Sequence, residues 1–181
     1  MNKRLRYIPN SEIDTQKWDA CISAAPNSRV YAISWFLDRT AENWDALVWG
    51  DYKFVMPLTF KRKWGMTYLY QPTFCQQLGI FPEPPADIAS VFFDALVNRF
   101  SYFNIQLNAA NPVIENYKNV CFTPRKNFLL NLSPDYETII KSFSNNTNRN
   151  IAKAKNNNLT LIEGISLKEY SEFVLQNQAF K

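Results

Sequence analysis

Three short apolar runs near the middle of the sequence constrain its fold more than any other feature. Residues 44–49, 54–60 and 66–70 are rich in β-branched and aromatic side chains, which is typical of strands. Gly50-Asp51 and Lys63-Trp64-Gly65 separate these runs, and both are typical of turns. Because connections this short join antiparallel neighbours, the pattern predicts an antiparallel meander.

Helical patterns lie on both sides of the predicted meander. Residues 4–8 predict a first strand, and Ser11 and Ser34 predict the N-caps of two helices that end near residues 25 and 43. Prolines within residues 82–85 open a further helix, in which apolar residues recur at helical spacing up to residue 100. The sequence therefore predicts an α/β (α+β) fold with a mixed, largely antiparallel sheet flanked by helices.

The rest of the chain alternates strand and helix patterns. We expect three more strands, at residues 103–107, 127–132 and 159–163. We expect three more helices, over residues 133–144, over the basic stretch 145–155 with an Asn cap, and from Ser166 onward. The last strand and helix have few partners in the chain and look like the opening unit of another domain. We therefore predict a first domain over residues 1–132 and a second, truncated one over residues 133–181.

Composition places the chain among ordinary globular proteins. Its 181 residues, 46% hydrophobic and 20% charged, suffice to bury a core without a metal or a disulfide. The first residues are basic, but no apolar segment of a signal peptide follows them. No run approaches the roughly 18 apolar residues of a transmembrane helix. We therefore predict a cytoplasmic protein with no membrane span.

The sequence contains no histidine and only four glycines. Without histidine, Ser-His-Asp hydrolases, Cys-His proteases and most zinc enzymes are excluded. The glycines lie too far apart for the glycine-rich loops that bind the phosphates of nucleotides and coenzymes. We therefore predict no cofactor in this chain. No carboxylate pair stands out as an acid/base couple, so we assign no catalytic residue.

Three cysteines, Cys21, Cys75 and Cys121, are far apart in the sequence and odd in number. Metal sites usually need closely spaced pairs and disulfide scaffolds need even sets, so we expect reduced thiols that are buried or partly buried. Cys75 lies in a polar loop and is the one candidate for a reactive thiol. No His, Lys or Arg adjoins it in the sequence, so nothing there lowers its pKa.

Two stretches carry a family resemblance. Residues 70–81, YQPTFCQQLGIF, contain a proline, then a polar and aromatic stretch, then Leu-Gly. Residues 143–154, FSNNTNRNIAKA, contain a Ser-led turn followed by an arginine, an apolar residue and a basic-small pair. Together with the early helix pair and the Pro-led helix, they resemble FemAB-like tandem acyltransferases, which have the acetyltransferase-like (GNAT) architecture.

The resemblance implies two GNAT-like units side by side, of which the second binds the acyl donor. It implies an acyl-CoA or aminoacyl-tRNA as donor, and an amine on a small molecule, peptide or glycan as acceptor. Here the second unit stops after its first helix, so the donor site is missing and the implied partner is a C-terminal acyltransferase domain. We expect this chain to contribute substrate binding and to be inactive alone.

The loop that follows the meander is the first candidate binding site. Tyr70, Gln71, Gln76 and Gln77 place a phenol and three amides beside aromatic residues, and such groups both donate and accept hydrogen bonds. They are suited to a peptide or a sugar. The alternative is a strand-end loop whose amides bind its own backbone.

Arg149 and Lys153 form the second candidate binding site. They are four residues apart, so they share one face of the predicted basic helix near its N-terminal end, where backbone N–H groups also favour anions. A phosphate or carboxylate of a substrate fits there. The alternative is a solvated basic helix.

A non-catalytic binding module is the second functional hypothesis, with a cell-wall peptide, glycan or partner protein as its ligand. It needs no C-terminal half. The net charge of +4 is mild, and Lys61-Arg62-Lys63 are predicted at a solvated hairpin tip. We therefore expect no nucleic-acid partner except a tRNA donor, and contact at that tip remains a third hypothesis.

Overall fold

The computed structural model describes residues 4–112, 117, 120–157 and 159–177. The chain divides into two units, Met1–Pro124 and Arg125–Lys181, which are described separately below as unit 1 and unit 2.

A four-stranded sheet forms the centre of unit 1. Its strands are β1 (Leu5–Ile8), β2 (Asn43–Trp49), β3 (Phe54–Lys63) and β4 (Met66–Leu69), in the order β1-β2-β3-β4. Every neighbouring pair is antiparallel, which confirms the predicted meander. Gly50 and Gly65 take φ of +62° and +76° in the two connecting turns, a conformation that glycine adopts without steric cost.

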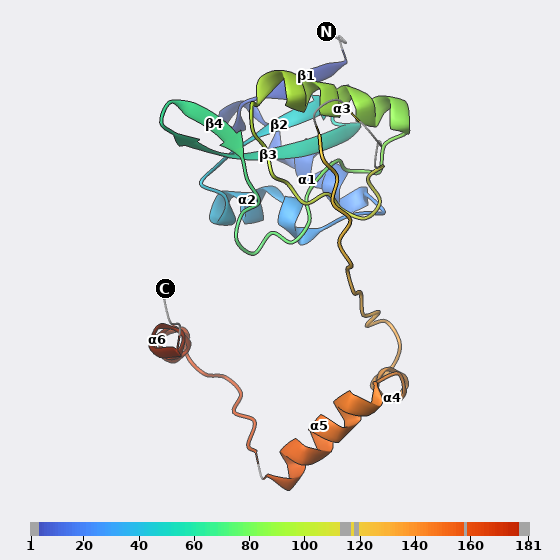
Figure 1. Cartoon of the computed structure of the whole chain (residues 1–181), viewed down its shortest axis with the longest axis vertical. Helices are drawn as coiled ribbons and strands as arrows, with labels where there is room; N and C mark the ends of the chain where they lie inside the picture. Colours follow the sequence, from blue (N-terminus) through green and yellow to red (C-terminus); the bar gives the residue numbers. More distant parts are fainter. Residues whose placement is uncertain (1–3, 113–116, 118–119, 158, 178–181) are drawn as a thin grey trace. The chain divides into compact units, whose positions relative to one another are not determined.

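Helices cover both faces of this sheet. Helices α1 (Thr15–Ala24) and α2 (Ser34–Thr40) lie on one face and α3 (Ala86–Arg99) on the other, as Figure 1 shows. Each face has its own core, one around Trp18 and Phe81 and the other around Phe92 and Leu96. The α+β fold predicted from the sequence is confirmed.

Both predicted caps of the early helices are wrong. Ser11 lies in the short 3-10 helix Asn10–Glu12, and the carboxylate of Asp14 caps α1 by accepting from the Lys17 N–H at 3.1 Å. Ser34 is the first residue of α2, not its cap. Its N–H and its hydroxyl donate to the two carboxylate oxygens of Asp19, at 2.8 and 2.7 Å.

The predicted strand at residues 103–107 is wrong as a regular element. Single parallel bridges join Leu69 to Phe103 and Leu78 to Leu107, and no strand forms there. The reason is that loop 70–77 interrupts the neighbouring strand. Between the two bridges, the Gln71 side chain accepts from the Gln106 N–H at 3.0 Å in place of a backbone carbonyl.

Unit 2 contains three helices, α4 (Tyr136–Lys141), α5 (Asn145–Asn156) and α6 (Leu167–Asn177). Asp135 caps α4, and Ser144 caps α5 by accepting from the Thr147 N–H at 3.1 Å, so the predicted Asn cap is wrong. None of the described residues of unit 2 is buried.

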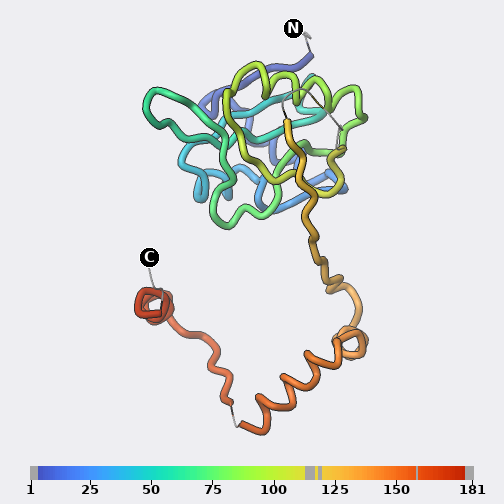
Figure 2. Tube along the Cα trace, in the orientation of Figure 1, coloured from blue at the N-terminus to red at the C-terminus, as the bar shows by residue number. Residues whose placement is uncertain are grey.

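The predicted strands at residues 127–132 and 159–163 are also wrong. Figure 2 shows both as extended stretches of the trace, and neither pairs with another strand in the described part of unit 2. A strand exists only when its backbone N–H and C=O groups bond to a neighbour, and the apolar pattern alone does not supply one.

No helix within the described residues has the length and the apolar character that a bilayer crossing requires.

Candidate functional site

Tyr70 is held in place at the end of the sheet. Its hydroxyl accepts from the Glu42 N–H at 2.9 Å, and its carbonyl accepts from the Thr59 hydroxyl at 2.5 Å. The Lys61 ammonium lies 4.8 Å from the centre of its ring and pairs with Glu42 at 3.3 Å. This phenol is therefore engaged within the fold.

Gln71 and Gln77 also bond within the chain. The Gln71 amide donates to the Cys75 carbonyl at 2.7 Å and accepts from the Gln106 N–H at 3.0 Å, so its side chain links the loop to the segment beside it. Gln77 is buried, and its amide oxygen accepts from Arg29 at 3.3 Å. Gln71 therefore binds the backbone of its own loop and of the adjacent segment, which was the alternative to ligand binding for this loop.

Thr73, Phe74 and Gln76 are the exposed residues of the loop. Gln76 is exposed, and Phe74 is 80% exposed with a φ of +73°. Of the four loop residues singled out in the sequence, Gln76 alone presents its amide to solvent within the described structure.

Burial raises the pKa of two of the thiols. Burial raises the pKa of Cys21 to about 11, and burial also raises the pKa of Cys75, whose sulfur lies 3.4 Å from the Thr40 hydroxyl. Because the thiolate is the reactive form, Cys75 is not suited to be a nucleophile. Cys121 is exposed, contrary to the expected burial.

Arg149 and Lys153 lie on α5 of unit 2, whereas the loop residues lie on unit 1. Both side chains are exposed, and Arg149 donates to the Asn146 side chain at 2.8 Å. This is the arrangement of a solvated basic helix, and it leaves both cations open to an anion from solvent.

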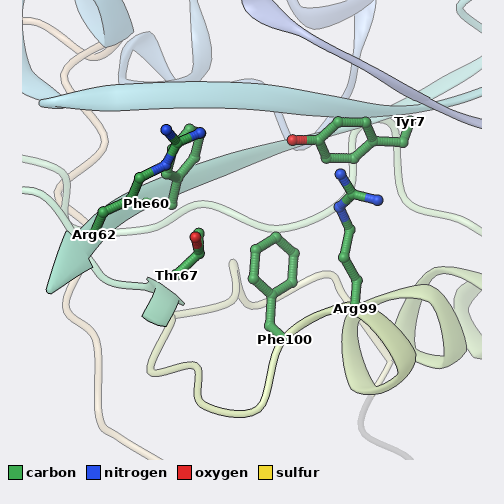
Figure 3. A pocket seen from close by; sticks show the side chains of 6 residues that line it. All are labelled: Tyr7, Phe60, Arg62, Thr67, Arg99 and Phe100. Carbon is green, nitrogen blue, oxygen red and sulfur yellow. The ribbon is translucent and has the colours of Figure 1, made fainter. Parts of the chain in front are cut away.

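The structure adds a pocket that sequence reasoning missed. It is open, has a volume of about 290 Å³, and lies between the ends of β1, β3, β4 and α3. Six residues line it, and the name arginine pocket is used for this set: Tyr7, Phe60, Arg62, Thr67, Arg99 and Phe100. Figure 3 shows Arg62 and Arg99 on either side of Thr67 and Phe100.

Tyr7 organises one wall of the arginine pocket. The Arg99 guanidinium lies 3.5 Å from the centre of the Tyr7 ring, and the Tyr7 hydroxyl donates to Asp45. Burial, followed by the hydrogen bond to Asp45, raises the pKa of Tyr7, so the phenol stays neutral. Tyr7 is therefore a donor to Asp45 and a platform for Arg99.

A second pocket, of about 550 Å³, adjoins the first and shares Thr67 and Arg99 with it. The name adjoining pocket is used for its lining: Gly65, Met66, Thr67, Tyr68, Arg99, Ser101 and Tyr102. Neither lining includes an acidic residue. Together the two pockets place arginine side chains next to aromatic rings.

One local signal for this site was present in the sequence. The triplet Lys61-Arg62-Lys63 is not at the hairpin tip, as predicted, but forms the last part of β3, opposite β4. Arg62 thereby reaches the arginine pocket. Tyr7 and Arg99 are far apart in the sequence, and no local pattern connects them.

Among the described residues, no group of three or more His, Cys, Asp or Glu side chains is close enough to hold a metal ion. Comparison with protein-family models, curated proteins and solved structures finds no match to this chain.

Proposed function

We propose that this chain is the N-terminal part of a FemAB-like or GNAT-like N-acyl or aminoacyl transferase that acts in the cytoplasm. In this proposal it contributes substrate binding, and a C-terminal acyltransferase domain binds the donor, an acyl-CoA or an aminoacyl-tRNA. The acceptor is an amine on a small molecule, peptide or glycan.

The apolar surface of unit 2 is the observation that carries this proposal. Large apolar side chains of this unit are at least half exposed: Phe128, Leu129, Leu130, Leu132, Leu159, Leu161, Ile162, Ile165, Leu167, Tyr170, Phe173 and Leu175. Exposed apolar surface on this scale is typical of a surface that another part covers. Unit 2 is therefore suited to be the beginning of a domain that further residues complete.

The order of elements in unit 1 supports the same proposal. A strand, two helices, three antiparallel strands and a Pro-led helix follow one another, and these features underlie the resemblance. Direct attack of an amine on a donor carbonyl depends on positioning and on backbone dipoles more than on a side-chain nucleophile. A chain with raised cysteine pKa values and no histidine is compatible with that chemistry.

The test compares the chain that ends at Lys181 with the product read from the DNA beyond that codon. We expect an in-frame continuation with a Gly-rich loop after a strand. We expect the longer protein, and not residues 1–181, to bind acetyl-CoA or to use an aminoacyl-tRNA. Hydrogen exchange at residues 127–132 and 159–163 is expected to be slower in the longer protein. A stop codon after Lys181, or micromolar binding of acetyl-CoA to residues 1–181 by calorimetry, contradicts the proposal.

A non-catalytic binding module is the second candidate. The observation that favours it is that the exposed amide of Gln76 and both pockets belong to unit 1 alone. As a module, unit 1 binds a cell-wall peptide, glycan or partner protein without turnover and without a C-terminal half. Saturable binding of such a ligand to residues 1–124, lost on Gln76→Ala, favours the module, because Gln76 is the exposed amide of the loop.

A further inference from the structure

The two arginines of the arginine pocket have no acidic partner among the residues that the structure describes. Arg62 and Arg99 both line the pocket and both are exposed. No carboxylate forms an ion pair with either of them in the described part of the chain. Like charges that share a pocket repel each other, and an anion between them removes that repulsion.

Arg99 has five N–H donors, more than its contact with Tyr7 can use. The carbon of its guanidinium lies 3.5 Å from the centre of the Tyr7 ring, a cation–π contact, and the group also interacts with the Tyr7 side chain electrostatically. The N–H donors lie around the edge, which is the part that binds carboxylate or phosphate with two parallel hydrogen bonds. The contact with Tyr7 also reduces the conformational entropy that Arg99 loses when it binds a ligand.

The neighbouring charges are already engaged. Asp45 accepts from the Tyr7 hydroxyl and from the Asn10 N–H, the latter at 2.8 Å. Lys61 pairs with Glu42 at 3.3 Å, and the Lys63 ammonium lies 4.6 Å from the centre of the Trp64 ring. The charges that remain directed at the pocket are those of Arg62 and Arg99, with the Thr67 hydroxyl between them (Figure 3).

Flat side chains continue from Arg99 into the adjoining pocket. Tyr68 and Tyr102 meet edge to face, with ring centres 6.4 Å apart, and Tyr102 is 62% exposed. Exposed aromatic faces of this kind are suited to stack with a planar ring. The volume of about 290 Å³ is at the lower limit of small-molecule sites, and the volume of about 550 Å³ is within their range.

We propose that the two pockets bind a small aromatic anion, with its carboxylate or phosphate between Arg62 and Arg99 and its ring against Tyr68 and Tyr102. This site does not depend on the acyltransferase proposal. It uses neither the loop at residues 70–77 nor unit 2, and its ligand can be an acceptor, a product or a regulator.

Calorimetric titration of the full chain tests the proposal with four probes. Phenyl phosphate and benzoate each carry a ring and an oxyanion, and they distinguish the two anion classes. Inorganic phosphate lacks the ring, and phenol lacks the charge. We expect at least one aromatic anion to bind saturably, and about tenfold or more tighter than inorganic phosphate and phenol, because a charged hydrogen bond and a stacked ring each contribute.

Single substitutions localise the binding. Arg62→Gln and Arg99→Gln are each expected to weaken it about tenfold or more. Arg39→Gln removes the same charge from an exposed position on α2, on the opposite face of the sheet, and is expected to leave the affinity unchanged. Tyr102→Ala is expected to reduce the preference for phenyl phosphate over inorganic phosphate.

Thermal unfolding of each variant separates loss of binding from loss of fold. Arg62 is the more informative position, because Arg99 also contacts the Tyr7 ring of the fold. Absence of binding of both aromatic anions to the wild-type chain overturns the proposal. Unchanged affinity in both arginine variants overturns it as well, as does equal affinity for phosphate and phenyl phosphate. Salt-sensitive retention of a single-stranded oligonucleotide that phenyl phosphate does not displace assigns the surface to nucleic acid and overturns it too.

Discussion

Gly79 lies where a side chain cannot fit. Its φ is +108°, and a Cβ there meets the Asn111 Oδ1 at 2.1 Å. That amide is buried and bonds twice to Ile80, accepting from its N–H at 2.7 Å and donating to its carbonyl at 2.8 Å. Substitution therefore displaces two buried hydrogen bonds as well as straining the backbone.

Gly79→Ala is expected to lower the free energy of unfolding by about 3 kcal/mol or more, because buried polar groups lose their partners. Gly50→Ala is the matched control. It also has a positive φ, of +62°, but the nearest atom to its Cβ is 4.0 Å away, so about 1 kcal/mol is expected. Urea unfolding measures both, and equal losses contradict this account of Gly79.

The three thiols are expected to react at very different rates. Burial raises the pKa of Cys21 to about 11 and raises that of Cys75, whereas Cys121 is exposed. At pH 8 the two raised pKa values keep these thiols protonated, so iodoacetamide should modify Cys121 first. The rate at Cys21 should rise with pH up to about 11. Mass spectrometry of timed samples measures this, and Cys75 labelling as fast as Cys121 contradicts it.

At the scale of elements, one carboxylate of α1 binds the first residue of α2. Asp19 of α1 accepts from both the N–H and the hydroxyl of Ser34, the first residue of α2. Asp19→Ala is expected to destabilise unit 1 by about 1–2 kcal/mol, the usual cost of losing a helix cap. Glu83→Ala, at an exposed position, is expected to change stability very little. Denaturant unfolding compares the two, and an equal effect contradicts the capping role.

The sequence predicts those elements whose signals are local. Helix α3 and strands β2 to β4 were predicted because proline, glycine and apolar periodicity specify them within a few residues. The prediction of a strand at residues 103–107 was wrong because a strand also needs a neighbouring strand, and loop 70–77 interrupts that neighbour. Asn27, Asn108 and Asn111 join this region instead, each donating to the Ile80 carbonyl. No propensity distinguishes such buried amides from loop asparagines.

The candidate site shows the same limit. The loop at residues 70–77 could be picked out because its polar residues are close together in the sequence. In the structure, however, Tyr70, Gln71 and Gln77 form hydrogen bonds within the fold. The arginine pocket could not be predicted from the sequence, because Tyr7 and Arg99 come into contact only in the folded chain. The tertiary structure determines which side chains lie together, and the spacing of residues in the sequence does not predict it.

For the whole molecule, the two units are expected to differ in stability. Both apolar cores consist of residues of unit 1, including Tyr117 and Phe122, which pack against the second core. Unit 2 has no buried residue among those described, so its helices lack the packing from which most helical stability comes. The stability of the chain therefore resides in residues 1–124.

A fragment of residues 1–124 is expected to unfold cooperatively with a thermal midpoint within about 2 °C of that of the full chain, since it keeps both cores. A fragment of residues 1–107 is the control. It lacks Asn108 and Asn111, which hold Ile80, and also Tyr117 and Phe122, so its midpoint should fall well below. Calorimetry measures both fragments beside residues 1–181. A large loss of stability in the 1–124 fragment means that unit 2 supports the fold of unit 1, and it contradicts the assignment of the stability to unit 1.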